Sequence, residues 1–186
     1  MSKNFYPFIG FSTGDPNGIG IEIILKSLSD ESLIKEFKAV VFSNYKLIDS
    51  QNKLFNTKCN VIKIKEIEES QQGCINVLNI NNNGFKQKFG ESNQQGGKFS
   101  RESLFSASKY LNEKKIDALV TAPINKNNIQ GQNFKFKGHT DFLDSAFVGD
   151  SLMFMVSDDI KVALLTEHVP IDDVVSQITP LLIKKR

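Results

Sequence analysis

The chain has 186 residues and a formal net charge of +2, with 40% hydrophobic and 24% charged residues. These values are typical of a globular protein that can bury a core, and they exclude a disordered or fibrous chain. Because basic and acidic residues are interspersed, there is no basic stripe of the kind that a nucleic-acid-binding protein needs, and we expect no nucleic-acid partner.

Short apolar runs alternate with helical patterns, which predicts an α/β fold with a parallel or mixed sheet flanked by helices. Residues 8–11 (FIGF) are predicted to form a first buried strand, and a turn rich in Gly and Pro follows it. A helix is predicted next, because apolar residues recur there with the spacing of one helix face. The apolar residues of this face are Ile21, Ile24, Leu25 and Leu28, and further strands are predicted at 39–42 (AVVF), 61–64 (VIKI) and 75–80 (INVLNI).

Residues 79–97 are rich in Asn, Gln and Gly, and they predict a long connection with room for a hairpin. Such a segment is either a polar surface loop or a mobile lid over a site. A helix is predicted from Ser100 to Leu111. It is followed by a buried strand within residues 117–123 (DALVTAP), which proline ends.

The last third of the sequence predicts a β-hairpin and then helices. Two apolar runs, 152–156 and 162–166, flank Ser157, Asp158 and Asp159, a composition that turns the chain. Pro170 is predicted to open a helix. A further apolar helical pattern at 181–183 runs into three basic residues without a capping signal, as in a helix that is cut short.

Cysteine usage and the amino terminus indicate the compartment. Cys59 and Cys74 are far apart and have no C-x-x-C spacing, which predicts two free thiols in a reducing environment. The first residues lack the charged and apolar regions of a signal peptide, and no apolar run reaches the ~20 residues that cross a bilayer. We expect a cytoplasmic protein with no membrane partner.

Residues 12–22 (STGDPNGIGIE) place three glycines between a strand and a helix. Glycines let the backbone turn sharply and approach a ligand, and the amides of a helix N-terminus favour an anion. However, the spacing G-x-x-x-G-x-G matches neither the dinucleotide fingerprint nor the P-loop. The segment is therefore either a close-packed structural turn or a ligand loop.

Residues 121–126 (TAPINK) follow the strand that proline ends. They are expected to lie over the carboxyl edge of the sheet, where α/β proteins bind their ligands. Lys126 could offer a positive charge to a phosphate, and Asn125 could donate a hydrogen bond to it. The alternative is a solvated lysine on a loop.

The segment Gly138-His139-Thr140 directly precedes a helical pattern. Thr140 is a candidate N-cap, whose hydroxyl would then only satisfy a backbone N–H. A helix start beside an imidazole is equally suited to bind a phosphate or a carboxylate. Both interpretations stay open on the residues alone.

Residues 164–170 (LLTEHVP) place Glu167 and His168 at the end of a predicted strand. An imidazole beside a carboxylate suits a divalent metal. A metal site needs at least three ligands, and the chain has two histidines in all. If His168 binds a metal, its partners must be carboxylates, another subunit or residues outside this chain.

Four segments taken in order resemble the amino-terminal half of the 4-hydroxythreonine-4-phosphate dehydrogenases, enzymes of pyridoxal phosphate biosynthesis. The resemblance runs over residues 8–180 and is weakest between 44 and 97. Any one motif is weak, but the ordered set is specific. The four segments are residues 12–22 (STGDPNGIGIE), 117–126 (DALVTAPINK), 136–143 (FKGHTDFL) and 162–174 (VALLTEHVPIDDV).

The resemblance implies the isocitrate/isopropylmalate dehydrogenase-like fold, a homodimer, a divalent cation (Zn, Mg or Co) and NAD or NADP. It implies oxidation and decarboxylation of 4-phosphohydroxy-L-threonine to 3-amino-2-oxopropyl phosphate. By position, His139 and Thr140 match the family's substrate-binding pair, and His168 matches the first of its metal-binding histidines. Lys126 and Asn125 are candidate phosphate contacts, and no catalytic residue is assigned.

Members of the family are longer, and their remaining metal ligands and nicotinamide site lie in a carboxyl-terminal half. Residues 1–186 are therefore expected to be the amino-terminal portion of a dehydrogenase, inactive alone, with an unpaired strand edge and uncovered apolar surface. Three alternatives stay open. They are a related dehydrogenase for threonate or erythronate 4-phosphate, a non-catalytic fragment, and a simple phosphate-binding α/β module.

Overall fold

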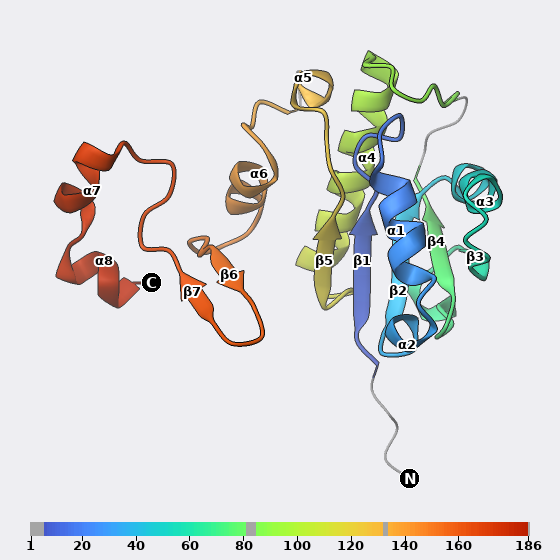
Figure 1. The fold of residues 1–186 in the computed structure, drawn as a ribbon, viewed down its shortest axis with the longest axis horizontal. Coiled ribbons are helices and arrows are strands. Elements are labelled where there is room, and N and C mark those ends of the chain that lie inside the picture. The colour runs from blue at the N-terminus through green and yellow to red at the C-terminus, as the bar shows by residue number, and fades with distance from the viewer. Residues whose placement is uncertain (1–5, 81–84, 132–133, 186) are drawn as a thin grey trace, which may run out of the picture. The chain divides into compact units, whose positions relative to one another are not determined.

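The computed structural model describes residues 6–80, 85–131 and 134–185 (Figure 1). The chain divides into two compact units, one ending at Phe142 and the other beginning at Leu143. Within the described residues, no helix is both long enough and apolar enough to cross a membrane. Cys59 and Cys74 are both free, as predicted.

The first unit is built on a five-stranded parallel sheet with the strand order β3-β4-β2-β1-β5 (Figure 1). Gly10 of β1, which lies between β2 and β5, is paired with Val40 of β2 and with Leu119 of β5. Because all pairs are parallel, the carboxyl ends of the strands meet at one edge of the sheet. The strands are β1 (Phe8–Ser12), β2 (Lys38–Ser43), β3 (Val61–Ile64), β4 (Ile75–Asn79) and β5 (Ala118–Thr121).

Helices cover both faces of this sheet, with α1 and α4 on opposite sides (Figure 1). Ala39 and Val41 of β2 belong to the core under α1, whereas Val40 and Phe42 belong to the core under α4. A strand that is covered on both faces needs a continuous apolar run, and AVVF supplies it. The helices are α1 (Gly20–Leu28), α2 (Glu31–Ile34), α3 (Tyr45–Leu54), η1 (Ile67–Glu69), α4 (Gln94–Asn112) and α5 (Lys126–Ile129).

The α/β prediction is confirmed, and the predicted apolar face of α1 is buried. Two details differ. Helix α4 begins at Gln94, six residues before the predicted start, because Asn93 caps it by accepting a hydrogen bond from the Gly96 N–H. Strand β5 is an edge strand and is only partly covered, with Val120 47% exposed. Of the predicted long connection, residues 81–84 lie outside the described residues, and 85–93 contain no strand.

The second unit contains the predicted hairpin, formed by β6 (Phe154–Val156) and β7 (Lys161–Ala163) as an antiparallel pair. A hydrogen bond from the Ser157 N–H to the Ile160 carbonyl closes its turn, at 2.9 Å. Helix α7 (Ile171–Gln177) begins directly after Pro170, as predicted, and α8 (Pro180–Lys185) follows. The boundary between the units falls inside α6 (His139–Ala146).

Candidate functional site

The glycine-rich turn after β1 packs directly against the segment that follows β5. Gly14 has a φ of 64°, and a Cβ at this position would lie 2.1 Å from the Pro123 carbonyl oxygen. Only glycine combines this backbone conformation with so close an approach. The Asp15 N–H donates a hydrogen bond of 2.9 Å to the same oxygen. The two predicted segments therefore meet at the carboxyl edge of the sheet.

Two buried polar residues of this turn, Asp15 and Asn17, bind other parts of the protein. Asp15 accepts hydrogen bonds from the Asn17 N–H at 3.0 Å and from the Asn128 amide at 3.4 Å. The Asn17 side chain accepts from the Lys88 N–H and donates to the Glu91 carbonyl. Because these groups are satisfied by protein partners, the structure supports the interpretation of residues 12–22 as a close-packed structural turn.

Lys126 begins α5, and its side chain lies beside the Gly138-His139-Thr140 segment. A Cβ at Gly138 would be 3.9 Å from Lys126 Cε. Asn125, predicted as a phosphate contact, caps α5, because its side chain accepts hydrogen bonds from the Asn127 and Asn128 N–H groups. The structure thus places Lys126 beside Gly138, directly before the His-Thr pair, and it gives the side-chain oxygen of Asn125 a structural role.

Helix α6 begins at His139, so Thr140 lies in its first turn and is not its N-cap. The first helical hydrogen bond runs from the Phe142 N–H to the Gly138 carbonyl, at 3.2 Å. Asp141 also accepts a hydrogen bond of 2.9 Å from the Lys137 N–H, which ties a residue two positions before the helix start to its first turn. The Thr140 side chain is exposed in this first turn. The N-cap interpretation of Thr140 is therefore wrong.

The His139 imidazole is half-buried, and its Nε2 has no hydrogen-bond partner among the described residues. Burial lowers the pKa of His139 below its ordinary value, because desolvation penalises the imidazolium. A neutral imidazole whose Nε2 has no protein partner can donate a hydrogen bond to a polar ligand or accept one from it. This is the chemistry that the substrate-binding prediction for His139 needs.

Four phenylalanines hold this helix start in place, and sequence reasoning missed them as a group. The rings of Phe105 and Phe142 lie 5.2 Å apart between centroids, and Phe134 and Phe136 complete the cluster. They connect α4, the segment before α6 and α6 itself. The available signal was the alternation of Phe134 and Phe136 shortly before Phe142. That alternation indicates buried aromatic positions without revealing their partner on α4.

In the second unit, His168 lies in the loop between β7 and α7, with an exposed side chain and a φ of 56°. A positive φ is uncommon for a residue with a Cβ and is often found at functional sites. Oε2 of the neighbouring Glu167 is buried and has no hydrogen-bond partner within the described part of the chain. The two histidines belong to different units, and their roles in substrate and metal binding stay predictions.

The described residues do not by themselves supply a complete donor set for a metal ion. Among residues 6–80, 85–131 and 134–185, no group of three or more His, Cys, Asp or Glu side chains could hold a metal ion. The His168 imidazole and the carboxylate oxygen of Glu167 that has no hydrogen-bond partner within the described residues are both of the ligand types that bind divalent metals.

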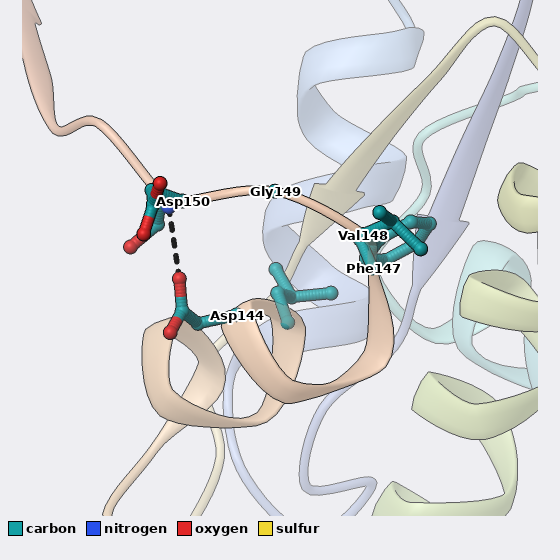
Figure 2. A pocket seen from close by; sticks show the side chains of 7 residues that line it. Asp144, Phe147, Val148, Gly149 and Asp150 are labelled. Atoms are coloured by element: carbon teal, nitrogen blue, oxygen red, sulfur yellow. Dashed lines mark hydrogen bonds between the residues drawn. The ribbon is translucent and has the colours of Figure 1, made fainter. Parts of the chain in front are cut away.

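A cavity of about 230 Å³ lies at the end of α6 (Figure 2). Asp144 accepts a hydrogen bond of 2.8 Å from the Ser151 N–H, which folds residues 147–151 back onto the helix. Gly149, with a φ of 124°, allows this reversal. Asp150 is paired with Lys185 at 2.9 Å. The two acidic residues that line this cavity, Asp144 and Asp150, thus both interact with other residues of the chain.

Comparison with known proteins gives the family. Residues 35–186 match the family model described as "Pyridoxal phosphate biosynthetic protein PdxA". The chain is 31% identical over 180 residues to 4-hydroxythreonine-4-phosphate dehydrogenase of Bacteroides thetaiotaomicron, covering 96% of this chain and 50% of that protein. It is 35% identical over 172 residues to the enzyme of the same name from Sulfurihydrogenibium sp., covering 92% and 52%.

A third relative, from Halalkalibacterium halodurans, is provisionally named D-threonate 4-phosphate dehydrogenase. It is 29% identical over 180 residues, which cover 95% of this chain and 54% of the relative. The chain thus spans about half the length of the curated relatives it matches.

Solved structures of 4-hydroxythreonine-4-phosphate dehydrogenases also superpose on this chain over about half of their own length. A 4-hydroxythreonine-4-phosphate dehydrogenase from Burkholderia phymatum superposes with a TM-score of 0.87 at 27% identity, over 97% of this chain and 56% of that one. The enzyme of the same name from Klebsiella pneumoniae, at 24% identity, gives 0.82 over 99% and 57%. These neighbours confirm the predicted dehydrogenase fold, which is related to that of isocitrate dehydrogenase. The chain therefore belongs to the PdxA family of pyridoxal phosphate biosynthetic proteins.

Proposed function

We propose that this chain forms the amino-terminal, substrate-binding portion of an NAD- or NADP-dependent 4-hydroxythreonine-4-phosphate dehydrogenase. The reaction is the oxidation and decarboxylation of 4-phosphohydroxy-L-threonine to 3-amino-2-oxopropyl phosphate. The observation that carries the proposal is the position of Lys126 beside Gly138, directly before His139 and Thr140. A cation then lies beside the segment that carries a neutral imidazole and an exposed hydroxyl.

Each of these groups suits a phosphorylated hydroxy amino acid. The Lys126 ammonium attracts the phosphate as a point charge, and the Thr140 hydroxyl can donate to a phosphate oxygen. His139 keeps a nitrogen for a hydrogen bond to the substrate, because the ring is half-buried and its Nε2 has no partner within the described segments. Together they would fix the orientation of the alcohol carbon before hydride transfer.

The remaining parts of the site are assigned to residues beyond this chain. His168 would bind a divalent cation together with ligands from the other half of the enzyme or from a second subunit. When bound, such a cation polarises the oxygen atoms of the substrate and stabilises the negative charge that develops on them. The nicotinamide site is also placed in the other half. We further propose a cytoplasmic homodimer as the complete enzyme.

A second candidate substrate is D-threonate 4-phosphate, because a relative of nearly equal similarity carries that substrate in its name. The two compounds share the phosphate and the alcohol that Lys126, His139 and Thr140 would contact. They differ in the amino group, and no described residue is assigned to it. Direct comparison of the two substrates therefore decides between them.

The proposal is tested with a chimera that joins this chain to the carboxyl-terminal half of the Sulfurihydrogenibium relative. We expect the chimera to reduce NAD or NADP with 4-phosphohydroxy-L-threonine and a divalent cation (Zn, Mg or Co), and the 186-residue chain alone to be inactive. A His139→Ala change should raise KM, and His168→Ala should raise the cation concentration required. Turnover by the chain alone, or a soluble folded chimera that turns over neither substrate, would contradict the proposal.

A further inference from the structure

Helix α5 carries Lys126 and has four residues, so neighbouring elements have to hold it in place. It packs against the first half of α4, where a Cβ at Gly97 would lie 1.7 Å from the Asn128 carbonyl oxygen. The Asn128 side chain accepts a hydrogen bond of 2.6 Å from the Ser92 hydroxyl and donates one of 3.4 Å to Asp15. These contacts hold one side of α5, and its carboxyl end has a different partner.

The carboxyl end of α5 is capped by a side chain from α4. The helix ends at Ile129, and Gln130 follows with a φ of −59° and a ψ of 146°. This conformation is extended and is not the left-handed one that lets backbone N–H groups close a helix. Instead, Arg101 Nη1 donates hydrogen bonds to the Ile129 and Gln130 carbonyls, at 2.6 and 3.2 Å. Because a guanidinium is always charged in proteins, both bonds are charge-assisted.

Arg101 also lies against the segment that leads from α5 to His139. A Cβ at Gly131 would be 3.3 Å from Arg101 Nη1, and Gly131 exchanges two backbone hydrogen bonds of 3.2 Å with Phe134. Phe134 in turn contacts the Phe105 ring, at 6.2 Å between centroids. Arg101 and Phe105 are four residues apart on α4, so one face of that helix holds both the end of α5 and the segment after it.

We propose that Arg101 is a positioning residue, which sets the place of the Lys126 ammonium relative to His139 and Thr140 by fixing the carboxyl end of α5. The inference rests on the proposed function, since it concerns how that candidate site binds a phosphorylated substrate. Arg101 acts through the α5 backbone and is assigned no contact with the substrate. Without its guanidinium, α5 would have to become ordered when the substrate binds, which lowers the affinity.

Hydrogen exchange of the intact 186-residue chain tests the capping step without substrate. The amides of Ile129, Gly131 and Phe134 make backbone hydrogen bonds directly beside the cap. Arg101→Gln should speed their exchange at least about tenfold, because a hydrogen bond to a charged group is lost and the segment opens locally. The amides of β1 and β2 should be unchanged. Lys109→Gln, at an exposed position on the same helix, is the control and should alter none of these rates.

The kinetics of the chimera test whether Arg101 acts on substrate binding. Arg101→Gln should raise KM for 4-phosphohydroxy-L-threonine about two- to tenfold, the cost of ordering a loosened segment. The kcat should stay within about twofold, because a loosely held Lys126 weakens the ground state and the transition state alike. Both cap bonds come from one nitrogen, so Arg101→Lys, which keeps a charged nitrogen, should restore most of the affinity.

A double-mutant cycle identifies the group through which Arg101 acts. In a Lys126→Gln background, Arg101→Gln should change KM by less than about twofold, because the ammonium that it positions is gone. A residue that served only the stability of the fold would instead affect both backgrounds equally. A guanidinium that contacted the phosphate directly would also add its full effect in both backgrounds.

Three results would overturn the inference. Unchanged exchange at the three amides in Arg101→Gln would show that the guanidinium does not hold α5. Equal fold-changes in KM with and without Lys126 would give Arg101 a role that is independent of the lysine. A lower kcat with an unchanged KM would remove its role in binding. The two kinetic results require an active wild-type chimera, so they are distinct from failure of the proposed function, in which the wild-type chimera turns over neither substrate.

Discussion

The rings of Phe105 and Phe142 lie 5.2 Å apart between centroids, and this contact joins α4 to the first turn of α6. Phe134 lies within ring contact of both, at 6.2 and 5.8 Å. His139 and Thr140 lie three and two residues before Phe142 on the same helix. The position of the candidate substrate-binding pair therefore depends on a cluster of aromatic rings.

Phe142→Ala should lower the free energy of unfolding of the chain by about 3–5 kcal/mol, because it removes a buried ring and leaves a cavity. Denaturant unfolding followed by circular dichroism measures the change. Phe154→Ala is the matched control: its ring is largely exposed in the chain alone, so the change should stay within about 0.5 kcal/mol. Equal effects of the two substitutions would contradict the described packing.

Gly97→Ala should also be strongly destabilising. A Cβ at Gly97 would lie 1.7 Å from the Asn128 carbonyl oxygen, so α4 and α5 would have to move apart. We expect a loss of about 1–3 kcal/mol, as for other overpacked sites. At Gly18 the nearest atom to an added Cβ is 3.4 Å away, so Gly18→Ala serves as the control in the same unfolding experiment. A neutral Gly97→Ala variant would show that the two helices are not in contact.

The pKa of His139 should lie below its ordinary value of 6.5, because burial penalises the charged ring. The chain has two histidines, so NMR titration of the imidazole protons, assigned with His139→Gln, gives a direct measurement. A pKa at or above the ordinary value would contradict the half-buried position of the ring.

The same shift predicts how stability depends on pH. Near and below pH 6.5 the unfolded chain binds more protons at this position than the folded chain does, so the free energy of unfolding falls as pH decreases through this range. This contribution is absent above pH 6.5, where both states are neutral. The wild-type chain should therefore lose more stability than His139→Gln between pH 7.5 and pH 5.5 in denaturant titrations.

Lys126→Gln should weaken substrate binding in the chimera. A hydrogen bond to a charged group contributes about 1.5–3 kcal/mol, so KM for the phosphorylated substrate should rise at least about tenfold. Lys109→Gln, an exposed lysine near the end of α4, is the control and should leave KM unchanged. If the two variants have the same KM, Lys126 is the solvated loop lysine of the alternative interpretation.

The sheet was largely predictable because its strands are short apolar runs. Residues 61–64 form β3 as predicted, and β1, β2 and the hairpin differ from the prediction by a few residues at their ends. The start of α4 was not predictable from apolar spacing, since residues 94–97 (QQGG) carry no apolar periodicity and depend on the Asn93 cap. The exposure of β5 was missed because DALVTAP has the composition of a covered strand.

Part of the candidate site was proposed from residue types that carry its chemistry. His139, Thr140 and Lys126 stay predicted substrate contacts from their motifs, and the structure places Lys126 beside Gly138, directly before the other two. The roles of Asp15 and Asn17 were not predictable from the sequence, because they depend on hydrogen bonds to segments about 70 and 110 residues away along the chain. His168 stays a predicted metal ligand on the family resemblance.

A crystal structure of the chimera with a divalent cation and 4-phosphohydroxy-L-threonine is the most direct test of the account. We predict that His168 ligates the cation, while His139, Thr140 and Lys126 contact the phosphorylated substrate bound to that same cation. A structure in which the substrate lies away from His139, or in which the two imidazoles face separate surfaces, would contradict it.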